Sequence, residues 1–137
     1  MTPTIRAGST GDIDAVLHLW ARSGAEPTHT DDAPSLQALI EHVGSALLVA
    51  QDRGELVGSV IAAWDGWRGS VYRLAVDPAH RRVGLARRLL AEAEAHLRSV
   101  GGVRLCAIVV ETEPEATGFW RTAGWEEQHH RLRFVKG

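Results

Sequence analysis

The sequence predicts a mixed α/β fold, in which a central mixed sheet is flanked by helices on both faces. Two observations support this prediction. Short apolar runs bounded by Gly, Asp and Pro turns alternate with stretches whose apolar residues recur every three to four positions. In addition, residues 103–110 are nearly all apolar after Arg104, which is typical of a strand buried on both faces. With 137 residues, the chain is long enough for one domain with its own core.

The N-terminal third is expected to form one strand and two helices. Thr4–Ala7 is a short strand, and Ser9 follows it as a candidate N-cap. Pro34 is suited to the first turn of the second helix. Apolar residues fall at helical spacing at Ile13, Val16, Leu17 and Trp20 in the first helix and at Leu36, Leu39, Ile40 and Val43 in the second.

The rest of the chain is expected to form a three-stranded meander followed by two further strand and helix units. The turn residues Asp52-Arg53-Gly54 join the first two strands of the meander. The expected ranges are strands 46–51, 55–64 and 70–77, a helix 84–100, a strand 103–110, a helix 113–122, and strands 125–127 and 131–135. The predicted order is therefore β-α-α-β-β-β-α-β-α-β-β.

Composition narrows the class of protein. The single cysteine, Cys106, allows no intrachain disulfide and is expected in the buried strand as an inert core residue, so a cytoplasmic location is expected. The N-terminus lacks an apolar leader, and no apolar run has the length that a membrane span needs, so no membrane partner is expected. A net charge of −2 argues against a nucleic-acid partner. Residues 1–65 carry nine acidic and three basic residues, which weakly favours a cationic partner.

The most informative motif is Arg81-x-x-Gly84-x-Ala86, which follows an expected strand and opens an expected helix. Small residues at a helix start leave backbone N–H groups uncovered, and the helix dipole makes that end positive, so the motif suits a phosphate group. The glycine pattern of dinucleotide-binding folds is absent, and so is the Walker motif, because the only lysine is Lys136. The sequence therefore predicts a pyrophosphate site of another kind.

The segment around this motif resembles the acetyl-CoA motif of the GCN5-related N-acetyltransferases, the GNAT family, with its Q/R-x-x-G-x-G/A signature. Thr4–Trp20 resembles the family's first strand and helix, Glu55–Ile61 its hairpin strand, and Ala116–Trp125 its A-x-x-F-Y-x-x-x-G-F helix. The four segments occur in the family's order, so the resemblance implies a GNAT fold in a single domain over residues 1–137. The turn at Asp65–Tyr72 also resembles a small bacterial branch of the family.

The resemblance implies acetyl-CoA as cosubstrate and no metal. Backbone groups of Leu74, Ala75 and Val76 would pair with the pantetheine arm, and the segment that begins at Arg81 would hold the pyrophosphate. The implied cofactor-binding residues are Leu74, Ala75, Val76, Arg81, Arg82, Val83, Gly84, Leu85, Ala86, Arg87, Phe119 and Trp120.

The activity implied by the resemblance is direct transfer of an acetyl group from acetyl-CoA to a primary amine in a ternary complex. Trp120 stands where the family often has a tyrosine that acts as the acid, Glu113 replaces a frequent asparagine, and Ser70 lies near the position of a carboxylate in some members. An indole N–H donates a hydrogen bond but gives up no proton at neutral pH. These departures leave an alternative function, a non-catalytic module that binds or senses acyl-CoA.

Acyl transfer needs a neutral amine, so a carboxylate, or a water bound to one, is expected to take its proton. The catalytic candidates are Glu111, at the end of the apolar strand, Asp65, and the only tyrosine, Tyr72, as an acid. Asp65 fits equally well as the cap of its own turn. For Tyr72, core packing or a single hydrogen bond is favoured over the role of an acid.

The acceptor is expected to meet aromatic and acidic residues. Trp64 and Trp67 flank a turn, and Asp31 and Asp32 end an acidic loop, so the four could bind a cationic amine by charge and cation–π contact. A peptide N-terminus, a lysine side chain, a polyamine, an aminoglycoside and a small amine all stay open. The expected strand 131–135 offers an edge through which two copies could pair as a homodimer.

Overall fold

The computed structural model describes residues 2–81, 83–109 and 114–137. The chain divides into two compact units, of which the first ends at Ala107 and the second spans Ile108–Gly137. Each unit is described by itself below.

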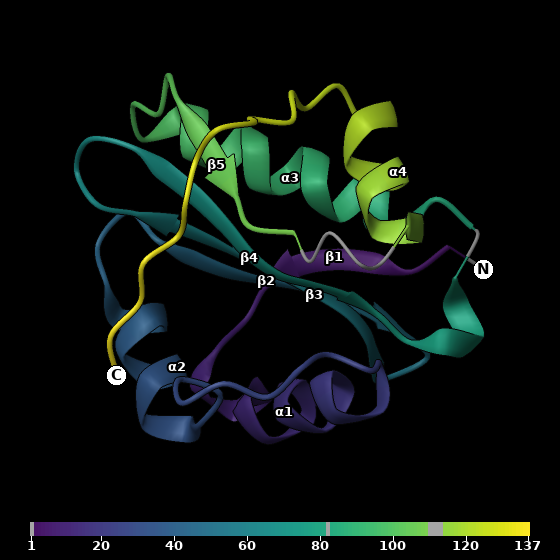
Figure 1. Ribbon diagram of the computed structural model, residues 1–137. Helices are drawn as coiled ribbons and strands as arrows, with labels where there is room; N and C mark the ends of the chain where they lie inside the picture. Colours follow the sequence, from purple (N-terminus) through teal and green to yellow (C-terminus); the bar gives the residue numbers. More distant parts are fainter. Residues whose placement is uncertain (1, 82, 110–113) are drawn as a thin grey trace. The chain divides into compact units, whose positions relative to one another are not determined.

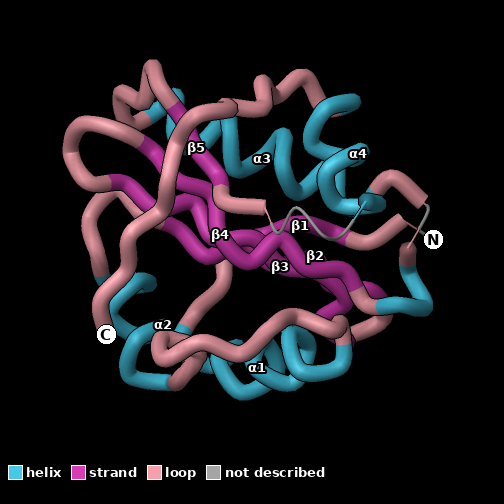
Figure 2. Tube along the Cα trace, in the orientation of Figure 1, coloured by secondary structure: helices cyan, strands magenta, loops and turns pink. Residues whose placement is uncertain are grey.

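The first unit is built on one five-stranded sheet with strand order β1-β2-β3-β4-β5. All neighbours are antiparallel except β4 and β5, which run parallel, so the sheet is mixed as expected. Figure 2 draws its strands in magenta. The strands are β1 (Thr4–Ala7), β2 (Ala46–Asp52), β3 (Glu55–Trp64), β4 (Gly69–Val76) and β5 (Leu105–Ala107).

Three helices cover the two faces of this sheet. The ribbon shows α1 (Ile13–Arg22) and α2 (Ala33–Glu41) on one face and α3 (Leu85–Ser99) on the other (Figure 1). Two short 3-10 turns, η1 (Thr10–Asp12) and η2 (Pro78–His80), precede α1 and α3. These elements confirm the predicted fold class and the order of elements through α3.

Each face of the sheet has its own apolar core. On the α1 and α2 side, Val16, Leu19 and Trp20 are buried against Leu47 and Ile61. On the α3 side the helix buries Leu85, Leu89, Leu90, Ala93 and Leu97. Gly58 allows this close packing, because a Cβ built there would lie 2.8 Å from the Leu89 Cδ1 atom. The cores hold α3, and hence its N-terminus, in a fixed place on the sheet.

The ladder between β3 and β4 contains a β-bulge. Ile61 pairs with Tyr72 and Ser59 pairs with Ala75, so two residues of β4, Arg73 and Leu74, face the single residue Val60. Arg73 has φ of 51°, a left-handed conformation that is uncommon for a side-chain-bearing residue. Bulges of this kind re-aim a strand and are frequent next to active sites.

The second unit holds α4 (Pro114–Thr122). The Trp120 ring contacts Phe119 and Trp125 edge to face, with centroid distances of 5.8 and 4.8 Å. The Trp125 N–H also donates to the Trp120 carbonyl oxygen at 3.1 Å, which closes the end of the helix.

The C-terminal strands differ from expectation. Residues 125–127 and 131–135 form no strand, because they enter no ladder with another described segment, and Leu132, Phe134 and Val135 are exposed. The edge expected for pairing of two copies is therefore not formed by this segment. The order of elements within the described residues ends after α4.

The strand expected over 103–110 was also predicted too long and too buried. Only Leu105–Ala107 is a strand, Val103 and Ile108 are exposed, and residue 110 lies outside the described residues. Cys106 is exposed rather than a core residue. The physical reason is that β5 pairs with β4 on one side only within the described chain. Among the described residues, no helix combines the length and the apolar character that crossing a membrane requires.

Candidate active site

One edge of β4 is paired for only part of its length. β5 pairs with β4 from Gly69 to Val71, and from Tyr72 to Val76 no strand of the described chain lies on that side. This stretch, residues 72–76, is called the open edge. Backbone polar groups without a ladder partner are available to bind a ligand in an extended conformation.

The register shows which backbone groups point outward at the open edge. The Asp77 N–H donates to the Val57 carbonyl oxygen at 2.8 Å, and Val76 lies opposite Gly58. In an antiparallel ladder hydrogen-bonded and non-hydrogen-bonded pairs alternate, so the N–H of Val76 points away from β3. Ala75 lies opposite Ser59 in the alternate position, with its backbone groups directed at β3. Of the three expected pantetheine contacts, Val76 thus presents an outward N–H.

The open edge leads directly to the N-terminus of α3. Gly84 is the N-cap residue with φ of 79°, and no side chain caps the helix there. A Cβ built at Gly84 would meet no atom within 4 Å, so the space before the helix is open. Leu85 is buried and anchors the first turn, while Ala86 is half-buried. We call residues 81–86, of which Arg82 lies outside the described residues, the phosphate cradle.

The side chain of Arg81 makes contacts that sequence analysis did not predict. Its Nη2 donates to the Ser23 carbonyl oxygen at 2.7 Å, and its Nε donates to the Val76 carbonyl oxygen at 3.3 Å. The guanidinium therefore ties the cradle to the end of α1. Arg87 is an exposed residue in the first turn of α3.

Two acidic residues hold the connection between β4 and α3. Asp77 accepts from the Ala79 N–H at 2.9 Å and from the Arg22 Nε at 3.1 Å, and these contacts keep the pKa of its carboxyl below the usual value, the Ala79 N–H contributing most. His80 Nε2 lies 3.2 Å from Oδ2 of Asp52, the last residue of β2. The connection is thus fixed to α1 on one side and to β2 on the other.

The cradle fits a phosphate group on these observations. Its helix end has no competing side-chain cap, its N-cap position is a glycine with open space in front, and α3 is long enough to carry a dipole. The outward N–H of Val76 lies on the strand that leads into it. An extended phosphorylated ligand could therefore run from the cradle along the open edge.

The three catalytic candidates differ in whether the structure describes them and in what surrounds them. Glu111 lies outside the described residues. Asp65 is exposed and accepts from the N–H groups of Arg68 and Trp67 at 2.7 and 2.8 Å, which lower the pKa of its carboxyl, so its contacts are those of a turn cap. Tyr72 is 48% exposed and begins the open edge, which excludes the alternative of a core residue.

The four acceptor candidates are scattered. Asp31 pairs with Arg73, and Asp32 caps α2 by accepting from the Ser35 N–H at 2.8 Å. Trp64 is half-buried, and its indole lies so close to Gly44 that a Cβ there would come within 2.5 Å of the ring.

The last candidate, Trp67, is 69% exposed, and the Arg68 guanidinium lies 4.2 Å from its ring centroid. Of the four, Asp31 contacts Arg73 of β4 through its side chain, and Trp64 lies opposite Gly69 of β4 in the ladder. The two cofactor candidates of the second unit, Phe119 and Trp120, contact each other there.

Sequence analysis missed the residues around the bulge. The Trp20 Nε1 donates to the fully buried Ser59 Oγ at 2.8 Å, and Ser59 Oγ in turn donates to the Arg73 carbonyl oxygen at 3.3 Å. The signal that could have found them is an arginine inside an otherwise apolar strand. These two hydrogen bonds hold the bulge, and with it the open edge, in place.

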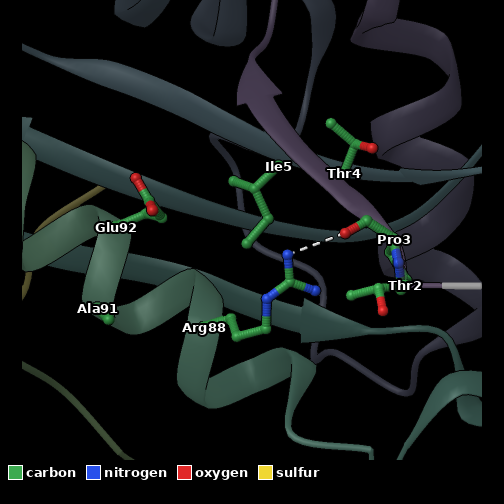
Figure 3. A pocket seen from close by; sticks show the side chains of 7 residues that line it. All are labelled: Thr2, Pro3, Thr4, Ile5, Arg88, Ala91 and Glu92. Atoms are coloured by element: carbon green, nitrogen blue, oxygen red, sulfur yellow. Dashed lines mark hydrogen bonds between the residues drawn. The ribbon is translucent and has the colours of Figure 1, made fainter.

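A separate shallow hollow of about 510 Å³ lies between the N-terminal segment and α3 (Figure 3). Arg88 spans it and donates from Nη2 to the Pro3 carbonyl oxygen at 2.9 Å, while Glu92 lies one turn further along α3. The hollow borders β1, on the side of α3 away from the open edge of β4. A neighbouring hollow shares Thr2, Pro3 and Arg88 with it and also reaches Val83 and Leu85 of the phosphate cradle.

Comparison with known proteins assigns this geometry to a family. The model of the acetyltransferase (GNAT) family matches residues 13–125. An acetyltransferase of Pectobacterium atrosepticum is 32% identical over 122 residues, which cover 89% of this chain and 86% of that protein.

Solved structures share the fold at low identity. An acetyltransferase of Clostridium acetobutylicum, determined with acetyl-CoA, superposes with a TM-score of 0.82 at 13% identity and covers 97% of this chain and 96% of its own. The aminoglycoside 6'-N-acetyltransferase AAC(6')-IG of Acinetobacter haemolyticus gives a TM-score of 0.80 at 18% identity, with 98% of each chain covered.

Proposed function

The chain belongs to the acetyltransferase (GNAT) family, and from this premise we propose that it transfers an acetyl group from acetyl-CoA directly to a primary amine within a ternary complex. The single observation that supports the mode of binding most is the continuity of the open edge with the uncapped N-terminus of α3. An extended pantetheine arm and an adjacent pyrophosphate are the two chemical parts that such a surface suits.

The proposed reaction needs little covalent chemistry from the protein. The neutral amine attacks the thioester carbon, a C–N bond forms, the C–S bond breaks, and the coenzyme A thiolate leaves. The outward N–H of Val76 would donate to the oxygen on which negative charge develops. Acetyl-CoA supplies the activated acyl group, while the chain binds and orients both partners.

We propose an acid and a base for the proton transfers from among the catalytic candidates. We propose Tyr72, which is exposed at the start of the open edge, as the acid that protonates the departing thiolate. The turn-cap contacts of Asp65 lower the pKa of its carboxyl and so weaken it as a base. We therefore keep Glu111 as the proposed base, directly or through water.

For the acceptor we propose a small-molecule amine. Support comes from the aminoglycoside N-acetyltransferases, which share the fold with this chain. The surface charge adds little, because the carboxylates of Asp31 and Asp32 are used within the protein.

Calorimetry with acetyl-CoA tests the proposed binding mode. Gly84→Asp places a carboxylate before the N-terminus of α3, so we expect acetyl-CoA affinity to fall at least about tenfold, or roughly 1.4 kcal/mol. Gly54→Asp is the matched control, because Gly54 has φ of 83° and open space around it but lies in the β2–β3 turn. Backbone strain should be similar in the two variants, and only the first should lose affinity.

A thiol-release assay over a panel of amines tests the transfer itself. We expect turnover above the rate of acetyl-CoA hydrolysis with at least one small amine. Tight acetyl-CoA binding without turnover on any amine would contradict transfer and favour a binding module. Equal affinity of the two glycine variants would show that the cradle is misplaced.

A further inference from the structure

We infer that Arg73 is a positioning residue for the amine acceptor, because its ion pair with Asp31 holds residues 23–32 as one wall of the acceptor site. These residues connect α1 to α2 and are called the acceptor loop. The inference rests on the proposed function and adds to it a residue on which acceptor binding depends.

The contact between Arg73 and the acceptor loop has several parts. The Nε donates to Asp31 Oδ1 at 3.0 Å, and Nη2 donates to Asp31 Oδ2 and to the Glu26 carbonyl oxygen, the latter at 2.8 Å. Both charged side chains are only 17% exposed. Paired donors on one carboxylate fix orientation as well as distance, so the contact sets the position of the loop.

Asp31 carries this constraint into the rest of the loop. Its Oδ2 also accepts from the Thr28 N–H at 2.9 Å, and its own N–H donates to the Thr28 carbonyl oxygen at 3.2 Å. One arginine on the sheet thus orders the tip of the loop through a single carboxylate. Asp32, the next residue, is committed to capping α2.

Arg73 is itself held at both ends. Its carbonyl oxygen accepts from Ser59 Oγ, and its guanidinium lies 5.3 Å from the centroid of the Trp20 ring. Its left-handed φ of 51° is kept by these surroundings. Unusual backbone conformations persist where neighbouring contacts over-determine them, and they cluster at ligand-binding sites.

The ion pair between Arg73 and Asp31 lies on the side of the sheet that we propose for the acceptor. Arg73 lies in β4 three residues before Val76, and its partners belong to the side of the sheet that α1 and α2 cover (Figure 1). The phosphate cradle leads into α3, which covers the opposite face, and among its described residues only the Arg81 side chain reaches the acceptor loop, at the Ser23 carbonyl oxygen. A cofactor held from the α3 side leaves the α1 and α2 side for the acceptor, and the acceptor loop is the wall fixed there by Arg73.

The pairing of the Asp31 carboxylate with Arg73 indicates that Asp31 positions the loop rather than binding the acceptor directly. The Asp31 carboxylate is matched by Arg73 and is largely covered, so it offers little charge to a cationic acceptor. Its role is to shape the wall. Removing the pair should therefore loosen the tip of the loop around Thr28 and weaken acceptor binding, while the start of α3 and the Arg81–Ser23 contact at the beginning of the loop are retained.

Steady-state kinetics with an amine that the wild type acetylates tests this inference. We expect Arg73→Met and Asp31→Asn to raise the acceptor KM at least tenfold, and Asp31→Asn, which leaves β4 unchanged, to keep kcat within threefold and acetyl-CoA affinity in calorimetry within twofold of the wild type. Arg73→Lys keeps one charge-assisted contact and should recover part of the loss. Asp31→Asn leaves the β4 bulge untouched, so it reports on the loop even if Arg73→Met folds poorly.

The matched control is Arg6→Met. Arg6 also binds an aspartate through two nitrogens, at 2.8 and 2.9 Å to Asp12, but at the β1 edge of the sheet. It should leave acceptor KM and acetyl-CoA affinity unchanged. An unchanged acceptor KM in Asp31→Asn, or acceptor KM and acetyl-CoA affinity weakened to the same degree, would overturn the inference. A wild-type protein that acetylates no amine would overturn the proposed function instead, before any variant is compared.

Discussion

Two turns of the sheet have similar backbone conformations but different surroundings. The β2–β3 turn contains Gly54 with φ of 83°, and the β4–α3 connection contains Gly84 with φ of 79°, both with open space around them. At the first turn, β2 and β3 stay paired to their ends: Gln51 lies opposite Leu56, and Asp52 lies opposite Glu55. At the second, β4 has one open edge and leads into an uncapped helix.

This difference shows where the fold can bind a ligand. Backbone groups that pair within the sheet contribute to stability and are not available to a ligand. The Val76 N–H at the open edge and the N–H groups at the uncapped start of α3 are directed outward. Perturbing the paired part should therefore change stability, and perturbing the open part should change binding.

The largest stability effect is expected in the core that supports the cradle. Leu89 is completely buried beneath the sheet. Leu89→Ala should reduce the free energy of unfolding by about 2–5 kcal/mol, measured by urea denaturation. The folded fraction should still bind acetyl-CoA, because the variant removes no group of the cradle. A loss below about 1 kcal/mol would contradict the close packing of α3.

A smaller loss is expected at the bulge. Ser59→Ala leaves the buried Trp20 indole N–H without its acceptor and frees the Arg73 carbonyl oxygen. An unsatisfied buried donor costs about 1–3 kcal/mol, so denaturation should show a loss of that size. Unlike Leu89→Ala, this variant should also weaken acetyl-CoA binding, since the bulge sets the direction of the open edge. A loss of stability with full affinity would separate the bulge from binding.

The β1 edge provides a pH-dependent comparison. Hydrogen bonds from Arg6 lower the pKa of Asp12 from 3.8 to about 2. The folded-state pKa lies below the unfolded one, so the pair stabilises the protein above pH 3.8 and this contribution is lost as the pH falls towards 2. Asp12→Asn should remove that part of the acid sensitivity, an effect of roughly 1 kcal/mol or less for a partly exposed pair.

The check is thermal unfolding at several pH values from 2 to 6, in the wild type and in Asp12→Asn. The two curves should differ above pH 4 and converge near pH 2. Acetyl-CoA affinity at neutral pH should be the same in both. A difference that grows as the pH falls would contradict the sign of this contribution.

The smallest effect is expected in the second unit. Trp120 cannot act as a general acid, so Trp120→Phe should keep kcat within about tenfold of the wild type. A fall beyond about a thousandfold would give Trp120 a chemical role, because general acid–base catalysis contributes roughly a hundredfold to ten-thousandfold. Phe119→Leu is a fitting control, because it alters the same aromatic cluster and leaves the indole in place.

Sequence analysis predicted the parts that local patterns encode. Turn residues such as Asp52-Arg53-Gly54 marked the hairpin, helical spacing marked α1 to α3, and the motif at Arg81 to Ala86 marked the uncapped helix start. Each of these signals lies within about twenty residues of sequence. The family assignment from four such segments is confirmed.

Long-range contacts could not be predicted in the same way. Arg73 and Asp31 are 42 positions apart, and their pairing depends on a bulge that shifts the β3–β4 register. The apolar content of residues 103–110, 125–127 and 131–135 predicted more strand than the structure describes, because a strand also needs the edge of a neighbouring strand to pair with. For the same reason Cys106 is exposed although it stands in an apolar run.

The most direct test of the central claim is an acetyl-CoA titration of the ¹⁵N-labelled protein, followed by the backbone amide resonances. The account predicts large shifts for the N–H groups of Val76 and of residues 84–86, and small shifts for Gly54 and the β2–β3 turn. Large shifts confined to β1 and the hollow beside Arg88, with Val76 and Gly84 unmoved, would contradict it.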